Sequence, residues 1–418
     1  MKRVAVIGAG AAGLCSARHL CKHPDEFSVR LFEQSAVLGG AWVYTSQTDS
    51  YDCDRPLHSG MYDALRTNLP KEIMAFTDFS FDADIPSFMT HQEVLRYLQR
   101  YAEHYGLAKH VAFCTVVEKV APLLASDDDV TNPRWRIETR DLITSNHSCE
   151  DFDYVLICNG HYSKPFIPPI PGLESFPGCI THSHQYRKPS PFKDQTVLVI
   201  GDGFSGTDIM LDIAAVSKRV YLSNSHKPME VTLPQNVEQV SRVTAIIGNT
   251  VCTEERSLEV TCLIFCTGYL YHAPFLTENC GVMAESKRVH PCYHHTFNAT
   301  YPSMAFIGLN IRVIPFPCFD LQVQWVMAVW RGDKLLPSRD EMVQQCCHDY
   351  RLRLERGMPA HFAHYMGTLQ WDFYEQLAAM GGAPPLDPTV KEIYDIVSHR
   401  RLRDIQTYRD ELNQTPPW

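Results

Sequence analysis

The sequence lacks the features that mark several broad classes of protein. Its 15 cysteines are scattered over 418 residues and none forms a CxxC pair, so neither a disulfide framework nor a zinc ribbon is indicated. Reduced thiols in a reducing compartment are the simplest interpretation. No stretch of about 18 apolar residues occurs, and the apolar run at residues 4–7 is too short for a secretory signal. We therefore expect no transmembrane segment and a cytoplasmic protein, with peripheral association with the endoplasmic reticulum as the alternative.

Basic charge is also scarce. Lys and Arg number 38 against 48 Asp and Glu, which gives a net charge of −10. This acidic balance argues against nucleic acid as the main partner and against an anionic membrane surface. What is present is ordinary for a globular protein with a sizeable core: 45% hydrophobic and 21% charged residues. The length predicts two or three domains.

The chain opens with a strand–helix–strand pattern at residues 4–7, 11–21 and 29–33. The loop between the first strand and the helix reads Gly8-Ala9-Gly10-Ala11-Ala12-Gly13. In such a loop the first glycine makes a tight turn, the second lets the backbone approach a pyrophosphate, and the third lets helix and strand pack closely. The helix N-terminus presents free N–H groups to the phosphates. Glu33 lies 20 residues past Gly13, where a carboxylate meets a ribose hydroxyl.

The same pattern recurs at residues 196–200, 205–216 and 220–223. The second loop reads Gly201-Asp202-Gly203-Phe204-Ser205-Gly206. No acid follows the second strand, where the sequence reads Ser223-Asn224-Ser225-His226-Lys227. An acid would repel a 2′-phosphate, whereas Ser, Asn and Lys accept one, so the second site suits NADP and the first an adenosine ribose diol. Two dinucleotide sites in one chain imply hydride transfer from a nicotinamide to a flavin.

Three further motifs carry a resemblance to a known family. They are Gly39-Gly40-Ala41-Trp42, residues 61–72 with Thr67-Asn68, and residues 176–186, which match the pattern FxGxxxHxxx(Y/F). With the two loops and residues 265–269, the set is similar to the flavin-containing monooxygenases from Met1 to about Gly332. The nearest likeness is to the short, tail-less members, which include insect and fungal proteins.

The resemblance implies two cofactors, FAD on the first loop and NADPH on the second. For FAD the implied residues are Gly8, Ala9, Gly10, Ala11, Ala12, Gly13, Glu33, Gly40, Ala41, Trp42, Thr67 and Asn68. For NADPH they are Gly201, Gly203, Ser205, Gly206, Thr207, Asp208 and Lys227. The family has a Ser/Thr-Asn pair at the flavin and nicotinamide, which Thr67 and Asn68 match.

The resemblance also implies a reaction. NADPH reduces FAD, O2 adds to form a C4a-hydroperoxyflavin, and a soft nucleophile such as an amine or a sulfide takes the distal oxygen. Asn68 is the catalytic candidate, because it matches the asparagine whose amide keeps the oxygenating site in order. Its alternative role is that of a turn residue before Leu69-Pro70. The expected partners are a small-molecule nucleophile and O2, with a homodimer as an open alternative. The sequence does not name the physiological substrate.

Other interpretations stay open. A Baeyer–Villiger monooxygenase is disfavoured because Tyr186-Arg187 stands where that class ends its fingerprint in Trp-Pro or a similar pair. A non-catalytic, redox-sensing flavoprotein is a second alternative. His182 is interpreted as part of a linker between the domains rather than as a catalytic base. No metal is expected, because the spacing of His and Cys over residues 290–295 matches no usual zinc pattern.

We therefore expect an α/β fold of two dinucleotide-binding, Rossmann-like domains, with the NADP domain inserted in the FAD domain. Residues 1–164 and 281–418 form the FAD domain, including a C-terminal helical segment, and residues 165–280 form the NADP domain. The Pro-rich residues 165–171 carry the chain out, and a second crossing near residues 271–284 carries it back. From residue 337 on, the chain is helix-like and polar, and no chemistry is assigned to it.

Overall fold

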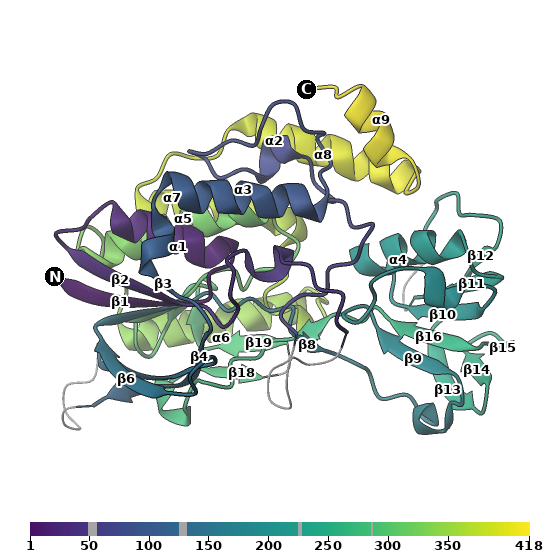
Figure 1. Cartoon of the computed structure of the whole chain (residues 1–418), viewed down its shortest axis with the longest axis horizontal. Coiled ribbons are helices and arrows are strands. Elements are labelled where there is room, and N and C mark those ends of the chain that lie inside the picture. Colours follow the sequence, from purple (N-terminus) through teal and green to yellow (C-terminus); the bar gives the residue numbers. More distant parts are fainter. Residues whose placement is uncertain (49–56, 125–131, 225–227, 286) are drawn as a thin grey trace.

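The structure is a computed structural model that describes residues 1–48, 57–124, 132–224, 228–285 and 287–418. Its two largest sheets are mainly parallel and carry packed helices, and they lie side by side along the long axis of the molecule (Figure 1). The α/β class with two dinucleotide-binding domains is confirmed.

The first sheet contains the N-terminal strand. Its strands are β1 (Lys2–Ile7), β2 (Phe27–Phe32), β3 (Val111–Ala112), β7 (Tyr154–Ile157), β20 (Cys292–Tyr293), β21 (Phe297–Asn298) and β22 (Met304–Phe306). They lie in the order β20-β21-β22-β7-β1-β2-β3 and are parallel from β22 to β3. Strands from both ends of the chain therefore share one sheet.

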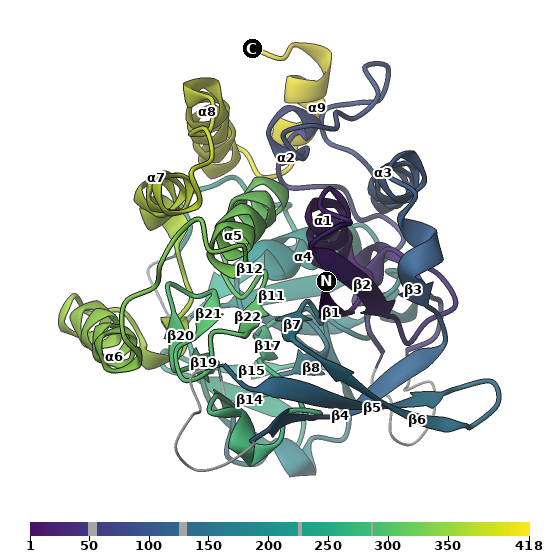
Figure 2. The same cartoon turned by 90° about the vertical axis from the view of Figure 1, so that its left-hand side faces the viewer.

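The two faces of this sheet are covered differently (Figure 2). Val4 and Val6 of β1 pack into a core under the helices α1 (Ala11–Cys21) and α5 (Pro315–Trp330). Ala5 and Ile7 face the opposite core, beneath the antiparallel strands β4 (Thr115–Leu123), β5 (Arg134–Asp141) and β6 (His147–Phe152). Because side chains alternate along a strand, a continuous apolar run such as β1 is buried on both faces.

Further short elements complete this domain. They are α2 (Lys71–Met74), α3 (His91–His104), α6 (Arg339–Glu355), α7 (Gln370–Gly381), β18 (Met283–Glu285) and β19 (Arg288–His290). The apolar residues Val94, Leu95, Leu98 and Tyr101 predict an amphipathic helix at residues 91–105, and the structure confirms it as α3. It begins at a capping box, in which the side chains of Thr90 and Glu93 each bond the other's backbone N–H.

The second sheet is built entirely from the inserted segment. Its strands are β9 (Cys179–His182), β10 (Thr196–Ile200), β11 (Arg219–Ser223), β12 (Val237–Val240) and β16 (Cys262–Phe265), in the order β12-β11-β10-β16-β9. Helix α4 (Phe204–Ala214) connects β10 to β11. An antiparallel sheet of β13 (Val243–Ile247), β14 (Thr250–Thr253) and β15 (Ser257–Glu259) packs beside it.

The chain leaves the first domain and re-enters it at one place. Strand β8 (Lys164–Pro165) pairs antiparallel with β17 (Tyr269–Leu270), so the outgoing and returning segments lie side by side. The boundaries 164/165 and 280/281 stay predictions.

The C-terminal helices span the two domains. In Figure 1, α8 (Pro388–Arg403) and α9 (Tyr408–Gln414) lie above the junction, drawn in yellow. Ile405, between them, is buried in the core of the second domain, and Leu412 is buried in that of the first. Among the described residues, no helix is both long and apolar enough to cross a membrane.

Candidate functional site: two dinucleotide loops and the joint between them

The first Gly-rich loop connects β1 to α1 in a conformation that requires glycine. Gly8 has φ +102°, and a Cβ there would lie 2.6 Å from the carbonyl oxygen of Cys158. A Cβ on Gly13 would lie 1.8 Å from the carbonyl oxygen of Gly8, so helix and strand leave no room for a side chain. No side chain caps the N-terminus of α1, which leaves backbone N–H groups of its first turn, at Ala11 and Ala12, for a ligand.

The predicted Gly40-Ala41-Trp42 segment lies against this loop as a short 3-10 turn. The Gly39 N–H donates to the carbonyl of Ala9 at 3.0 Å. A Cβ on Gly40 would lie 2.8 Å from the Cα of Gly10, so the two backbones approach with no side chain between them. The loop and the turn form a bare backbone cradle of the kind that a dinucleotide pyrophosphate needs.

Glu33 is buried directly beside the loop. One carboxylate oxygen accepts from the Ala9 N–H at 2.8 Å, and the other accepts from the N–H and the hydroxyl of Ser35, each at 2.8 Å. A carboxylate accepts about four hydrogen bonds, so these three leave capacity for one ribose hydroxyl. Glu33 thus stabilises the loop and stays available for the ribose contact that the sequence predicts.

The second loop repeats the geometry of the first. Gly201 has φ +105°, and its Cβ would meet the carbonyl oxygen of Cys266 at 2.6 Å. A Cβ on Gly206 would lie 1.9 Å from the Gly201 carbonyl oxygen. At Gly203, the residue before α4, a Cβ would meet nothing within 4 Å, and no side chain caps the helix. Open space in front of an uncapped helix N-terminus fits a bound phosphate. Ser205 is exposed in the first turn of this helix.

The segment expected to recognise a 2′-phosphate is described only in part. Lys227 lies outside the described residues. Asn224, at the end of β11, is buried, and its side-chain N–H2 group has no hydrogen-bond partner in the described part of the chain. Because buried polar groups are normally paired, a free amide at this position fits a ligand contact.

The Thr67-Asn68 pair lies where the first domain meets helix α4 of the second, at the contact of Thr67 with Arg409 and of Arg409 with Asp208, which we call the joint. The Thr67 hydroxyl accepts from the Met89 N–H at 3.0 Å, and its carbonyl accepts from Arg409 Nε at 2.9 Å. The Asn68 side chain is half-buried, and among the described residues it has no hydrogen-bond partner. Thr67 is therefore held at its hydroxyl and its carbonyl, while the Asn68 amide is left for a ligand.

Arg409 joins this pair to the second loop. Its two terminal nitrogens donate to the two carboxylate oxygens of Asp208, in α4, at 3.2 and 2.8 Å. The Tyr62 hydroxyl donates to the same carboxylate at 3.3 Å. Asp208 therefore contacts the joint, and Thr207, its neighbour, accepts from Arg401 at 3.0 Å. Sequence reasoning missed both arginines, because 342 residues separate Arg409 from Thr67 and no motif marks the C-terminal helices.

The fingerprint at residues 176–186 is a structural element of the joint. Phe176 is buried in the core of the second domain, and a Cβ on Gly178 would lie 2.2 Å from the Thr261 carbonyl oxygen. Of the two His182 ring nitrogens, Nε2 donates to the Gly268 carbonyl at 3.1 Å and Nδ1 accepts from the His184 N–H at 3.0 Å. Burial lowers the pKa of His182 to about 4. A neutral ring with both nitrogens occupied supports the linker role over that of a base.

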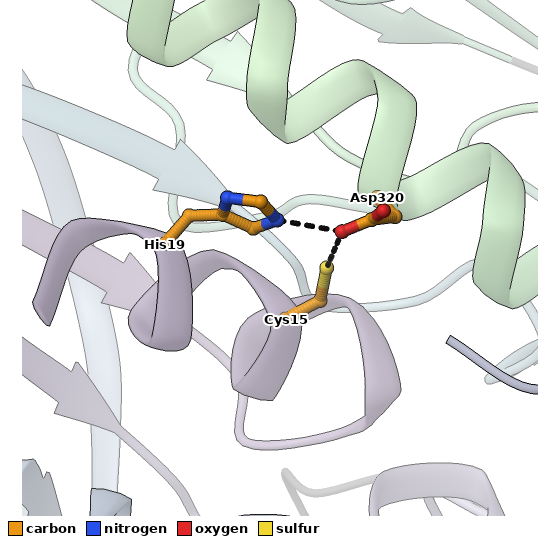
Figure 3. A group of neighbouring side chains, drawn as sticks. All are labelled: Cys15, His19 and Asp320. Carbon is orange, nitrogen blue, oxygen red and sulfur yellow. Dashed lines mark hydrogen bonds and ion pairs between the residues drawn. The ribbon is translucent and has the colours of Figure 1, made fainter. Parts of the chain in front are cut away.

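One cluster of metal-ligating side chains occurs among the described residues: Cys15, His19 and Asp320 (Figure 3). His19 Nε2 lies 2.6 Å from Asp320 Oδ1, and the Cys15 thiol donates to the same oxygen at 3.8 Å. Thr77 and Gln324 bond the other carboxylate oxygen. Arg18 lies 3.1 Å from the His19 nitrogen that faces the carboxylate, and this cation disfavours a metal there. We interpret the cluster as a polar contact that holds α1 against α5.

The fold and the two loops define an oxidoreductase with one site for a flavin dinucleotide and one for a nicotinamide dinucleotide. The sequence profile of the family described as Flavin-binding monooxygenase-like matches residues 1–229 and 227–385. Flavin-containing monooxygenase FMO GS-OX-like 4 of Arabidopsis thaliana is 36% identical over 428 residues, which cover 98% of this chain and 93% of the relative.

Solved structures agree with the sequence relatives. S-allyl-L-cysteine S-oxygenase from Allium sativum is 34% identical with a TM-score of 0.90, over 98% of this chain and 95% of that chain. Tmm from Pelagibacter sp. strain HTCC7211 is 26% identical with a TM-score of 0.83, over 97% of this chain and 92% of that chain. The chain belongs to the flavin-containing monooxygenase family. It is a flavoprotein monooxygenase that uses FAD and NADPH. The insect or fungal type expected from the sequence stays a prediction.

Proposed function

We propose that this monooxygenase transfers one oxygen atom of O2 to a soft nucleophile, with sulfides as the first substrate class and amines as the second. The observation that carries the proposal is the likeness to an S-oxygenase, at 34% identity over 98% of the chain. When bound and reduced by NADPH, the flavin supplies the oxygen chemistry, with a C4a-hydroperoxyflavin as the proposed oxidant.

The two loops bind and orient the cofactors. In the first loop, the backbone at Gly10 and the N-terminus of α1 bind the FAD pyrophosphate, and Glu33 accepts from its ribose. In the second loop, Gly203 leaves open space for the NADPH pyrophosphate. Thr67 and Asn68 lie near the helix that follows the second loop, since Arg409 bonds both the Thr67 carbonyl and Asp208 of α4.

Asn68 positions the reacting end of the cofactors. Its amide supplies two donors and one acceptor, all without partners in the part of the chain that is described. When NADP⁺ is bound, a neutral amide at this position would hold it without adding charge, and the bound dinucleotide would help to exclude water from the site. The Thr67 backbone is held by Arg409 at its carbonyl and by the Met89 carbonyl at its N–H, so the neighbouring amide is positioned before the cofactor binds.

No general base is required for this reaction, because the oxidant is already activated. The histidines of the joint agree with that. Burial lowers the pKa of His182 and of His184 to about 4 for each, so both rings are neutral near pH 7. His184 Nε2 bonds the Leu57 carbonyl at 3.0 Å. These rings support the backbone of the joint.

The proposal is tested by following NADPH oxidation together with product formation. Purified, FAD-loaded protein is given a dialkyl sulfide, a tertiary amine or a cyclic ketone, and products are identified by mass spectrometry. We expect sulfoxide in near-equal amount to NADPH consumed, and N-oxide more slowly. Lactone from the ketone would instead favour the Baeyer–Villiger alternative. Hydrogen peroxide alone with every substrate class would contradict the proposal.

A matched variant checks that turnover passes through the second loop. Gly203→Val places a side chain in open space at a backbone conformation that any residue adopts, with φ −65° and ψ −173°. The variant should keep its fold and its FAD but lose NADPH oxidation. The cytoplasmic location and the homodimer expected from the sequence stay predictions.

A further inference from the structure

Two arginines lie beside the second loop. Arg312 comes from the first domain, between β22 and α5, and Arg401 from the last turn of α8. Their guanidinium carbons lie 4.0 and 4.4 Å from the ring centroid of Phe204, the first residue of α4. Among the residues that the structure describes, no carboxylate lies within ion-pair distance of either. In the described part of the chain, both guanidinium groups therefore lie against the Phe204 ring with no carboxylate as a direct partner.

This arrangement is costly unless an anion completes it. Burial lowers the pKa of Arg401 from its usual value. Repulsion from Arg312 and Arg409 lowers it further, whereas Tyr408 and Asp208 act in the opposite direction. A partly desolvated cation without a counter-ion is unfavourable, whereas a guanidinium with free N–H groups is a strong ligand for phosphate. Arg401 has five N–H donors, and the structure shows one of them used, toward Thr207.

The loop itself holds Arg401 in place. The Thr207 hydroxyl accepts from Arg401 at 3.0 Å and donates to the carbonyl of Gly203 at 3.1 Å. Gly203 is the residue whose missing side chain leaves open space in front of the uncapped helix. A phosphate at this position would meet backbone N–H groups from α4 and a guanidinium anchored on the same turn.

We propose that Arg312 and Arg401 bind the pyrophosphate of the nicotinamide dinucleotide. The inference rests on the second loop being the NADPH site, as in the proposed function. The pyrophosphate is common to NADPH and NADH, so the two arginines supply affinity and not the choice between the cofactors. Binding would also couple the domains, because Arg312 belongs to the FAD domain and Phe204 to the inserted one.

The test uses FAD-loaded protein and measures the dissociation constants of NADP⁺ and NAD⁺ from the perturbation of the flavin spectrum. Arg401→Gln and Arg312→Gln should each weaken both dinucleotides by the same factor, between roughly tenfold and a hundredfold. The slope of log Kd against log salt concentration should become shallower in both variants. Arg403→Gln is the matched control, because Arg403 lies in the same turn of α8 and is exposed. It should change neither constant.

Unchanged constants in both glutamine variants would overturn the inference. A loss confined to NADP⁺ would also overturn it, because it would assign the arginines to the 2′-phosphate. If Arg401→Gln does not hold FAD, Arg401→Lys and Arg312→Gln test the inference in its place. The Arg401→Lys side chain keeps the positive charge but lacks the planar guanidinium group, so this variant should bind both dinucleotides with intermediate affinity. Failure of the unaltered protein to bind NADP⁺ would instead contradict the proposed function, so the two failures are distinguishable.

Discussion

Replacing Arg409 by methionine should weaken the joint between the two domains more than any exposed charge change nearby. The Arg409 and Asp208 side chains are 13% and 16% exposed, and the pair is bidentate. Removing one partner of a buried ion pair costs about 3–5 kcal/mol, because the other charge is left buried. Partial exposure of the pair and the hydrogen bond that Tyr62 still donates to Asp208 reduce this cost. We therefore expect the free energy of unfolding to fall by about 2–3 kcal/mol.

The assay is urea unfolding of the FAD-loaded protein, followed by flavin fluorescence and extrapolated to water. Arg66→Met is the control, because the Arg66–Asp410 pair is 30% and 62% exposed and contributes at most about 1 kcal/mol. Asp208→Asn should recover part of the loss when combined with Arg409→Met, since it removes the unpaired charge. If Arg409→Met costs no more than Arg66→Met, the pair is not what joins Thr67 to α4.

Three further predictions concern the cofactor sites. Gly10→Val should leave the fold intact, since a Cβ there meets only Gly40 at 3.4 Å. The valine side chain should fill the pyrophosphate cradle, so the protein should lose FAD on a desalting column. Normal FAD content would refute the assignment of this loop as the FAD site. Asn68→Ala should keep FAD and secondary structure but release hydrogen peroxide in place of product, measured as the ratio of peroxide to NADPH consumed; unchanged coupling would reduce Asn68 to a turn residue. Lys227→Ala should raise the KM for NADPH and leave the KM for NADH nearly unchanged. The increase in the KM for NADPH should become smaller as the salt concentration rises. Equal changes for both cofactors would show that Lys227 does not contact the 2′-phosphate.

The parts of the fold that sequence reasoning predicted correctly are those whose cause is local. In each domain a buried strand, a glycine turn and a helix follow one another within about twenty residues. The first glycine of each turn marks a position where the backbone needs a positive φ angle. The structure bears this out at Gly8 and Gly201, whose φ angles are +102° and +105°. The helix α3 was likewise predicted from its apolar periodicity, and the structure adds a capping box of Thr90 and Glu93 at its start.

The parts that could not be predicted depend on contacts between distant segments. The C-terminal helices α8 and α9 are polar and carry no motif, yet Arg401 and Arg409 reach α4 across 194 and 201 residues. A lone arginine on a polar helix normally faces solvent, so the sequence contains no signal that separates these two from their neighbours.

The measurement that tests the central claim most directly is the flavin spectrum during anaerobic reduction by NADPH and subsequent mixing with O2, in the absence of substrate. The account predicts that NADPH reduces the flavin and that mixing with O2 produces a long-lived oxygenated species, stabilised by bound NADP⁺, which decays at once when a sulfide is added. Direct return to oxidised flavin, with or without NADP⁺ and insensitive to the sulfide, would contradict it.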